Sequence, residues 1–274
     1  MKALSKLATA AGLALASGMS HAVLITDWSY VNHAGFDDGD WTPASAVTAT
    51  DIDGTTGYYK NLAWGTPVSG DDADPNSSFV VTSPAAGAVS TNGAAVAGTV
   101  LTHNNFPIVG EALETALLTS MLTLTPTAPI AGPPLPAPTL FFDIHFFETP
   151  NAGLEGDPTM CPDGTANFAG PNVAGCGDIF AIEDELSLAS AFVLGDYEYT
   201  VSISIDGGGI LSDTACSAVG FGSGCYGFIT EENAVNTVNP EFAISSRFIG
   251  VPEPSSIAVL GLAMGLLAFR NRKS

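Results

Sequence analysis

Hydrophobic and polar residues alternate along much of the chain, most regularly over residues 197–206. Tyr, Tyr, Val, Ile and Ile occupy the odd positions there, and Glu, Thr, Ser, Ser and Asp occupy the even ones. This period of two is typical of an antiparallel strand with one buried face. Three glycines at positions 207–209 then predict a turn.

Weaker stretches of the same kind, separated by clusters of Gly, Pro and Asp, predict strands at 23–31, 78–82, 95–103, 115–125, 139–148, 178–182, 187–194, 225–230 and 241–249. We therefore predict an all-β fold, an antiparallel β-sandwich or jelly-roll-like single domain with long loops over residues 23–250. Between Glu111 and Met121 the leucines also fit helical spacing, so a short helix is the alternative there.

Residues 125–138 contain six prolines. Because proline cannot donate to a strand ladder, this segment predicts an extended, polyproline-like connection rather than a central strand. A long loop within one sandwich is favoured over a linker between two domains, since each half alone would hold few strong strands.

In the predicted strand at 139–148, alternation places Phe142, Ile144 and Phe146 on one face, which we expect to be buried. Phe141, Asp143, His145 and Phe147 share the other face. This second face is either covered by another part of the fold, which is favoured, or an open aromatic platform that stacks on sugar rings.

Both ends of the chain carry sorting features. Lys2 and Lys6 precede an apolar stretch from Leu7 to Ala16, and small residues surround His21, so residues 1–22 predict a secretory signal peptide with an N-terminal helix. Its apolar part is shorter than the ~20 residues that a membrane-spanning helix needs.

At the other end, residues Pro252, Glu253 and Pro254 precede thirteen apolar or small residues from Ile257 to Phe269, and a basic cluster follows with Arg270, Arg272 and Lys273. A helix of that length covers only ~20 Å of a ~30 Å hydrocarbon core. Residues 251–274 therefore predict a short apolar helix that tethers the chain transiently to the inner membrane, with the basic cluster on the cytoplasmic side.

This tripartite end resembles a PEP-CTERM sorting signal. The resemblance implies an exported protein of a Gram-negative bacterium, found in the periplasm, at the cell surface or outside the cell, whose tail is cut by an exosortase. Tails of this kind are sometimes named after ice-binding proteins, a label that carries no information about ice.

A second motif lies in the middle of the chain. Thr102, His103 and Asn105 form a T-H-x-N sequence, and the stretch from Phe146 to Asn151 follows the proline segment. Together with the tail, these residues resemble the THxN group of PEP-CTERM proteins, which implies an exported protein without an established activity. We expect His103 to hydrogen-bond an adjoining loop. Contact with a metal or ligand is the first alternative, and catalysis the second.

The four cysteines agree with export. An oxidising compartment favours two disulfides. Three pairings are open, and the sequential one, Cys161–Cys176 with Cys216–Cys225, is favoured because each pair brackets a turn-rich segment. A zinc site is the rival interpretation, but no cysteine pair has the short spacing of a zinc knuckle.

The formal charge of -21 excludes nucleic-acid binding through a basic surface. Between residues 23 and 250 only Lys60 and Arg247 are basic. Acidic turns offer oxygen ligands for calcium at Asp51, Asp53, Asp71, Asp72 and Asp74, and also at Asp37, Asp38 and Asp40. No other cofactor is predicted. Solvated turn acids are the favoured interpretation. No EF-hand is complete, because Leu62 stands at the twelfth position from Asp51.

No nucleophile elbow and no zinc-protease helix is present, so we predict no catalytic residue and no enzyme. The favoured function is that of an exported envelope or extracellular-matrix protein, associated with exopolysaccharide and processed by an exosortase. A carbohydrate-binding module is the alternative. A hydrolase using His103 or His145 with nearby acids ranks third. His145 and Glu148 lie three apart in a strand, so they point to opposite faces and form no compact site from that strand alone.

Overall fold

The computed structural model describes residues 23–68, 75–136, 139–183 and 188–250. These residues divide into two compact units. The larger unit comprises Ile25–Phe192 and Tyr199–Ser246, and the smaller one contains residues 23–24, 193–198 and 247–250 among those described. The predicted signal peptide, the sorting tail and the candidate ligands Asp71, Asp72 and Asp74 lie outside the described residues.

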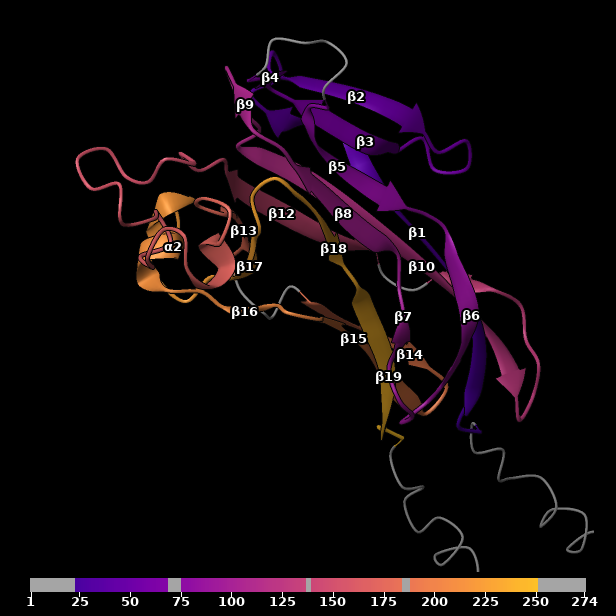
Figure 1. Cartoon of the computed structure of the whole chain (residues 1–274). Coiled ribbons are helices and arrows are strands. Elements are labelled where there is room, and N and C mark those ends of the chain that lie inside the picture. Colours follow the sequence, from indigo (N-terminus) through magenta and orange to yellow (C-terminus); the bar gives the residue numbers. More distant parts are fainter. Residues whose placement is uncertain (1–22, 69–74, 137–138, 184–187, 251–274) are drawn as a thin grey trace, which may run out of the picture. The chain divides into compact units, whose positions relative to one another are not determined.

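The fold is all-β with antiparallel sheets, as predicted. Its largest sheet contains thirteen strands (Figure 1). Ten of them follow one path, in the order β16 (Gly209–Ile210), β17 (Tyr226–Thr230), β13 (Asp178–Ile182), β12 (Leu140–Phe147), β10 (Thr115–Ala128), β1 (Asp27–Thr42), β3 (Tyr59–Trp64), β5 (Ser77–Thr82), β8 (Val100–Asn105) and β18 (Ala234–Val238). Off this path, β11 (Leu135–Pro136) pairs with β10, β2 (Val47–Ile52) with β3, and β6 (Ala85–Ser90) with β1.

The large sheet curls so that its two halves face each other across a common core. Phe79 on β5 packs against Phe146 on β12 and Phe180 on β13, with ring centroids 5.3 and 5.8 Å apart. Trp64 on β3 lies 5.2 Å from Phe146. Strands β3 and β5 belong to one half of the sheet and β12 and β13 to the other, and no strand of the first pair is a hydrogen-bonded neighbour of a strand of the second. Curling therefore buries the aromatic side chains of both halves in one cluster.

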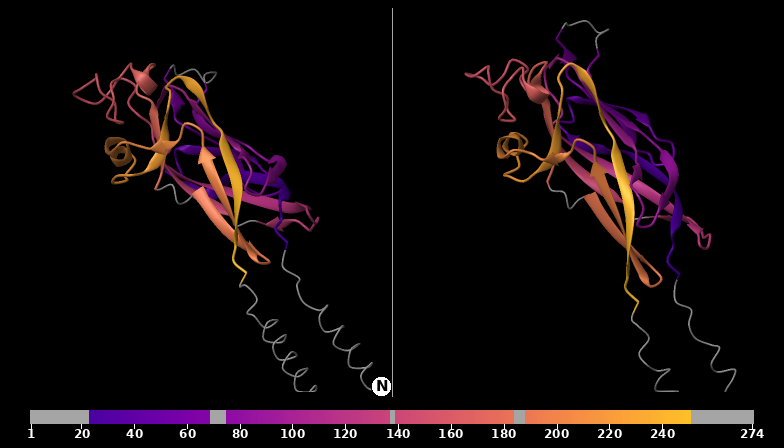
Figure 2. Two further views of the ribbon diagram at one scale, coloured as in Figure 1. Left: turned by 90° about the horizontal axis from the view of Figure 1, so that it is seen from below. Right: turned by 60° about the horizontal axis from the view of Figure 1, so that its bottom comes forward.

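A second, four-stranded sheet has the order β14 (Ala189–Leu194), β15 (Tyr197–Ile205), β19 (Pro240–Phe248) and β7 (Val96–Ala97). Within the larger unit, Ile203 and Ile205 of β15 pack against the core of the large sheet. Both views of Figure 2 show the yellow and orange strands of this sheet lying over the indigo and magenta strands. A third, small sheet pairs β4 (Thr66–Pro67) with β9 (Ile108–Val109).

A strand occurs at each predicted position, but two predictions differ in extent. The strand predicted at 23–31 is β1, which continues to Thr42, and the one predicted at 95–103 is divided into β7 and β8, which belong to different sheets. Strands β2, β3, β6 and β18 and the two-residue strands β4, β9, β11 and β16 were not predicted. Strand β6, with the sequence AAGAVS, is built mostly of small residues, so it carries little hydrophobic pattern of its own and is defined by its pairing with β1. The described residues also include a six-residue helix, α2 (Asp213–Ala218), that was not expected. It is capped by the Ser212 side chain, which accepts a hydrogen bond from the backbone of Ala215.

The middle of the chain confirms one prediction and corrects another. The strand predicted at 115–125 forms as part of β10, and the alternative of a helix between Glu111 and Met121 is wrong, because residues from Thr115 onward pair with β1 and β12. The proline segment is not wholly outside the sheet, since β10 continues through Pro126 to Ala128. The register between β1 and β10 shifts beside Pro126, so proline falls where the regular ladder is already interrupted.

Strand β12 buries one face and half-covers the other. Ile144 and Phe146 are buried and Phe142 is partly buried. On the opposite face, Phe147 packs on the cluster around α2, while Phe141 is 57% exposed. The second face is thus covered at one end and open at the other.

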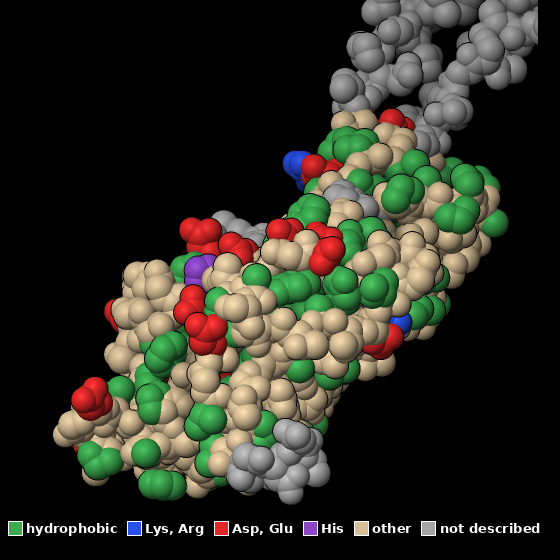
Figure 3. All heavy atoms as spheres, turned by 90° about the horizontal axis from the view of Figure 1, so that it is seen from above, with side chains coloured by type: hydrophobic (Ala, Val, Ile, Leu, Met, Phe, Trp, Pro, Cys, Tyr) green, Lys and Arg blue, Asp and Glu red, His purple; other side chains and the backbone are tan. Residues whose placement is uncertain are grey.

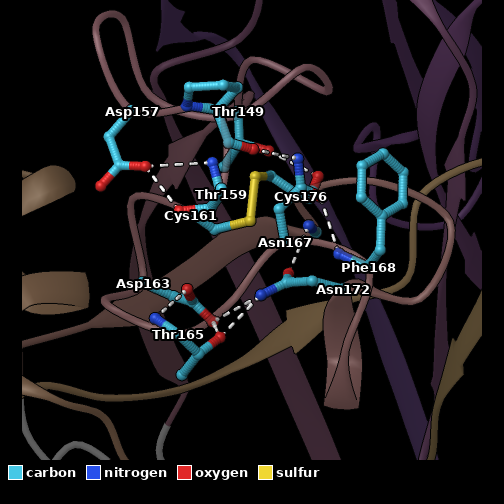
Figure 4. The surroundings of a disulfide bond; sticks show 12 residues. Thr149, Asp157, Thr159, Cys161, Asp163, Thr165, Asn167, Phe168, Asn172 and Cys176 are labelled. Carbon is cyan, nitrogen blue, oxygen red and sulfur yellow. Dashed lines mark hydrogen bonds between the residues drawn. A yellow bond between two sulfur atoms is a disulfide. The ribbon is translucent and has the colours of Figure 1, made fainter.

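Two disulfides form, in the predicted sequential pairing. Cys161 is joined to Cys176 and Cys216 to Cys225, and all four residues are buried. Figure 4 shows the first of these bonds within its loop, where the Asp157 and Asp163 carboxylates accept hydrogen bonds from the backbone of Thr159 and Thr165.

In the smaller unit, Arg247 pairs with Glu198, and the ring of Tyr197 meets that of Phe248 edge to face. Within the described ranges of the chain, no helix is long and apolar enough to cross a membrane.

Candidate functional site

Three carboxyl groups meet at one edge of the large sheet. Glu148 follows the last residue of β12, Asp178 is the first residue of β13, and Glu232 lies two residues after β17. Since these three strands are antiparallel neighbours, the end of β12, the start of β13 and the end of β17 share one edge. One oxygen from each carboxyl group lies within 4.8 Å of the others.

The other half of the curled sheet adds the histidine and asparagine of the T-H-x-N motif. Alternation along β8 turns His103 and Asn105 inward, where both are 0% exposed, and turns Thr102 to the opposite face. The His103 Nδ1 atom lies 2.9 Å from the Thr230 hydroxyl at the end of β17. His103 of the T-H-x-N motif therefore lies beside the acidic edge and hydrogen-bonds the last residue of β17.

Burial fixes the state of His103. Its ring lies between those of Trp64, Phe79 and Phe146, at centroid distances of 5.7, 5.0 and 5.2 Å. Burial lowers its pKa to about 3, so the imidazole is neutral at physiological pH.

The hydrogen-bond pattern then places the single imidazole proton. The Thr230 hydroxyl donates to the Asp178 backbone carbonyl at 3.2 Å, so it accepts from His103 Nδ1–H. This leaves His103 Nε2 as a bare lone pair 3.9 Å from Asp178 Oδ2. Because the imidazole is neutral, this contact is not an ion pair.

The carboxyl groups resist ionisation. Burial, followed by the nearby charge of Glu232, raises the pKa of Glu148 to about 7, although the Trp64 indole N–H donates to it at 3.1 Å. Burial and then the charge of Glu148 raise the pKa of Asp178 well above its ordinary value. Burial also raises the pKa of Glu232. Three negative charges are costly here unless a positive charge joins them.

The disulfide loop positions Asp178. The Thr149 backbone N–H donates to Asp178 Oδ1 at 2.8 Å, and the Thr149 hydroxyl donates to the Cys176 carbonyl at 2.6 Å. Gly177 lies between Cys176 and Asp178 in the chain. A Cβ atom added to Gly177 would lie 2.5 Å from the Thr230 carbonyl oxygen. The chain can therefore approach β17 this closely only with glycine at position 177.

Of the acidic turns predicted to bind calcium, two lie in the described part, that of Asp37, Asp38 and Asp40 and that of Asp51 and Asp53. Asp37 accepts a hydrogen bond from the Thr119 hydroxyl at 3.2 Å. Asp51 is exposed, and Asp53 already has partners. Its Oδ1 accepts backbone hydrogen bonds from Thr55 and Thr56, at 2.8 and 3.3 Å, and its Oδ2 lies 3.7 Å from Lys60 Nζ. The pKa of Asp53 is lowered chiefly by the Thr55 hydrogen bond.

His145, the other histidine considered for catalysis, lies outside the cluster. Its Nδ1 lies 2.9 Å from the Val219 carbonyl oxygen, and its ring tilts against Phe221 at 4.3 Å. Sequence reasoning did not identify Glu148, Asp178 and Glu232 as one site. The signal they carry is that each is an acid at or beside the end of a predicted strand.

The larger unit also holds an apolar cavity of about 80 Å³ between the large sheet and β15 and β19. Aliphatic and aromatic side chains, including Leu101, Phe142 and Ile203, make up most of its lining. Its mostly apolar lining offers few polar side chains that could bind an ion or a polar ligand.

On the surface, acidic side chains occur in several separate groups. Figure 3 shows them scattered among polar and hydrophobic side chains, with few basic ones on the same face. This distribution agrees with the acidic composition. The face shown has no basic patch to which a polyanion could bind.

Comparison with known proteins gives one assignment, at the C-terminal end of the chain. Residues 250–273 match the PEP-CTERM protein-sorting motif. The predicted sorting motif is thereby confirmed, and the apolar helix and membrane tether predicted for residues 251–274, which lie outside the described residues, stay predictions. The motif implies processing by an exosortase and export to the envelope or surface of a Gram-negative cell.

No curated protein matches the chain. Membership of the THxN group stays a prediction.

Proposed function

We propose that this chain is an exported, non-catalytic protein of the cell envelope or extracellular matrix. It belongs to the THxN group, enters the export pathway through residues 1–22, and is released or displayed after its tail is cut. The observation that carries the proposal is the sorting motif at residues 250–273. In this proposal residues 23–250 form a single β-sandwich domain that associates with exopolysaccharide.

The described domain supports this function in two ways. Two disulfides suit a protein that works outside the reducing cytoplasm. The closest approach of His103 to a carboxylate is 3.9 Å, beyond the ~3 Å reach of direct proton transfer, and His103 is fully buried from any substrate.

The test is the intact mass of the protein recovered from the envelope and from the culture supernatant. We expect the wild type to lose residues 1–22 and to be cut near Pro252–Pro254. Replacing Arg270, Arg272 and Lys273 together with glutamine removes the cytoplasmic anchor charge and should impair both inner-membrane retention and the C-terminal cut.

Arg247→Gln is the matched control, because it removes an exposed positive charge outside the tail. It should be processed as the wild type is. Normal processing of the triple variant, or a C-terminus left intact in the wild type, would contradict the proposal.

A carbohydrate-binding module is the second candidate, and exposed aromatic rings favour it. Phe141 on β12 is 57% exposed and Phe168 in the disulfide loop is 69% exposed. Aromatic faces of this kind stack on sugar rings. Binding of the producer's own polysaccharide that Phe141→Ala or Phe168→Ala abolishes, without a change in melting temperature, would select this candidate.

A further inference from the structure

We propose that His103, Asn105, Glu148, Asp178 and Glu232 form a buried binding site for one divalent cation, with Ca²⁺ as the first choice. The proposal assigns a ligand role to two residues of the T-H-x-N motif. It is independent of how the chain is sorted.

The first observation is a concentration of unsatisfied polar atoms. Among the described residues, seven buried side-chain nitrogen or oxygen atoms have no hydrogen-bond partner, and six of them lie in or beside this cluster. They are His103 Nε2, both polar side-chain atoms of Asn105, Asn151 Oδ1, Asp178 Oδ2 and Glu232 Oε2. Of these residues, Asn105 still interacts with Glu232 through its side chain and lowers the pKa of that group. Buried polar atoms rarely lack partners, so His103 Nε2, Asp178 Oδ2 and Glu232 Oε2 at one place indicate a missing ligand.

The second observation is the contact between His103 Nε2 and Asp178 Oδ2. Both atoms present lone pairs, both belong to fully buried residues, and they stand 3.9 Å apart. Neither can donate to the other when Asp178 is ionised. A cation that accepts electron pairs from both atoms satisfies them together, and it also offsets the repulsion among the three carboxylates.

The size and chemistry of the cluster fit such an ion. Three oxygen atoms that all lie within 4.8 Å of one another have a common point no more than about 2.8 Å from each, and small movements reach the 2.3–2.6 Å of calcium–oxygen bonds. Three carboxylates and the Asn105 amide oxygen are hard donors, which Ca²⁺ and Mn²⁺ prefer. The imidazole nitrogen of His103 would also suit Mn²⁺ or Zn²⁺.

The surrounding contacts hold the donors in place before an ion binds. The Trp64 indole N–H orients Glu148, the Thr149 N–H orients Asp178, and the Asn151 amide donates to Glu232 at 3.0 Å. The hydroxyl of Thr230 fixes the tautomer of His103. Such outer contacts hold the carboxylate oxygens of Glu148, Asp178 and Glu232 within 4.8 Å of one another, with His103 Nε2 beside Asp178.

The experiment uses the full chain, purified with its disulfides formed and freed of metal by a chelator. Titration calorimetry and native mass spectrometry with Ca²⁺, Mn²⁺ and Zn²⁺ in separate runs should show one ion per chain and a higher melting temperature when the ion is bound. Preference for Mn²⁺ or Zn²⁺ that His103→Gln removes would support the site with His103 as a direct ligand.

Asp178→Asn and Glu232→Gln should each weaken binding at least tenfold. Asp206→Asn, which neutralises an exposed acid outside the cluster, should bind as the wild type does. In chelator, Asp178→Asn should melt no lower than the wild type because it removes one of three repelling carboxylates. A folded variant that no longer responds to the ion therefore identifies a ligand rather than a structural residue.

Three results would overturn the proposal. The first is that no ion binds stoichiometrically at millimolar Ca²⁺, Mn²⁺ or Zn²⁺. The second is that Asp178→Asn and Glu232→Gln both bind the ion as the wild type does. The third is that Asp53→Asn, outside the cluster, loses ion binding. The first result would mean that protons, and not a cation, satisfy the carboxylates.

Discussion

Removing the Cys161–Cys176 disulfide should both destabilise the domain and weaken the acidic site. The bond closes a loop of 15 residues, and Cys176 stands two residues before Asp178. The Cys176 carbonyl also accepts the hydroxyl of Thr149, whose backbone N–H holds the Asp178 carboxylate. The double variant Cys161→Ala/Cys176→Ala tests whether this chain of contacts operates.

The loop length sets the expected loss of stability. In the chain-entropy description, closing 15 residues contributes about 3 kcal/mol, and closing the 9 residues between Cys216 and Cys225 contributes about 2.6 kcal/mol. For a domain of this size, about 3 kcal/mol corresponds to a fall of roughly 6–12 °C in melting temperature. The two disulfide variants should therefore lose similar stability.

Their effects on the acidic site should differ. Cys225 precedes the start of β17, at the end of that strand opposite Thr230 and the carboxyl cluster. Calorimetric titration with Ca²⁺, beside thermal unfolding followed by circular dichroism, should show weaker binding in the Cys161/Cys176 variant and unchanged binding in the Cys216/Cys225 variant. The reasoning would be refuted if the Cys161/Cys176 variant lost less than about 1 kcal/mol of stability. It would also be refuted if both disulfide variants lost ion binding to the same extent.

Three further predictions follow from side-chain environments. Phe147→Ala should lower the free energy of unfolding by about 2 kcal/mol, because the ring packs on the cluster around α2. Phe141→Ala should leave the melting temperature unchanged, because that ring is exposed. Equal losses of stability in the two variants would mean that both ends of this face of β12 are covered. Gly177→Ala should cost about 1–3 kcal/mol of stability and weaken ion binding, because the added Cβ would clash with the Thr230 carbonyl oxygen. Gly54→Ala, with open space around it, should be tolerated. An unchanged melting temperature of Gly177→Ala would contradict the close approach of residue 177 to β17. Asp53→Ala should cost at most about 1 kcal/mol at pH 7, because the Asp53 carboxylate accepts the backbone hydrogen bonds of Thr55 and Thr56. Since the pKa of Asp53 lies below its ordinary 3.8, this stabilisation is present above pH 3.8 and is lost as the pH falls below it. A difference from the wild type that persists at pH 2 in urea unfolding would contradict the role of an ionised carboxylate in this turn.

The sequence by itself determined the local features of this protein. Period-two alternation over residues 197–206 predicts β15, and most other predicted strands agree with the structure to within a few residues. The exceptions are β1, which is eleven residues longer at its end than predicted, and the stretch 95–103, which is divided into β7 and β8. The pairing of Cys161 with Cys176 followed from the turn-rich segment between them. The sorting motif at 250–273 is equally local, since its order along the chain is its whole signature.

Only the tertiary structure decided the rest. Strand β6 has little pattern of its own and exists because β1 pairs with it. Residues 115–121 fit both a helix and a strand, and pairing with β1 and β12 decided in favour of the strand.

The acidic site is the clearest case. His103, Glu148, Asp178 and Glu232 are far apart in the sequence, and no spacing rule connects them. Curling of the large sheet brings β8 over the shared edge of β12, β13 and β17. Burial in the aromatic core, which no single strand could provide, then keeps His103 neutral and raises the pKa of Glu148 to about 7.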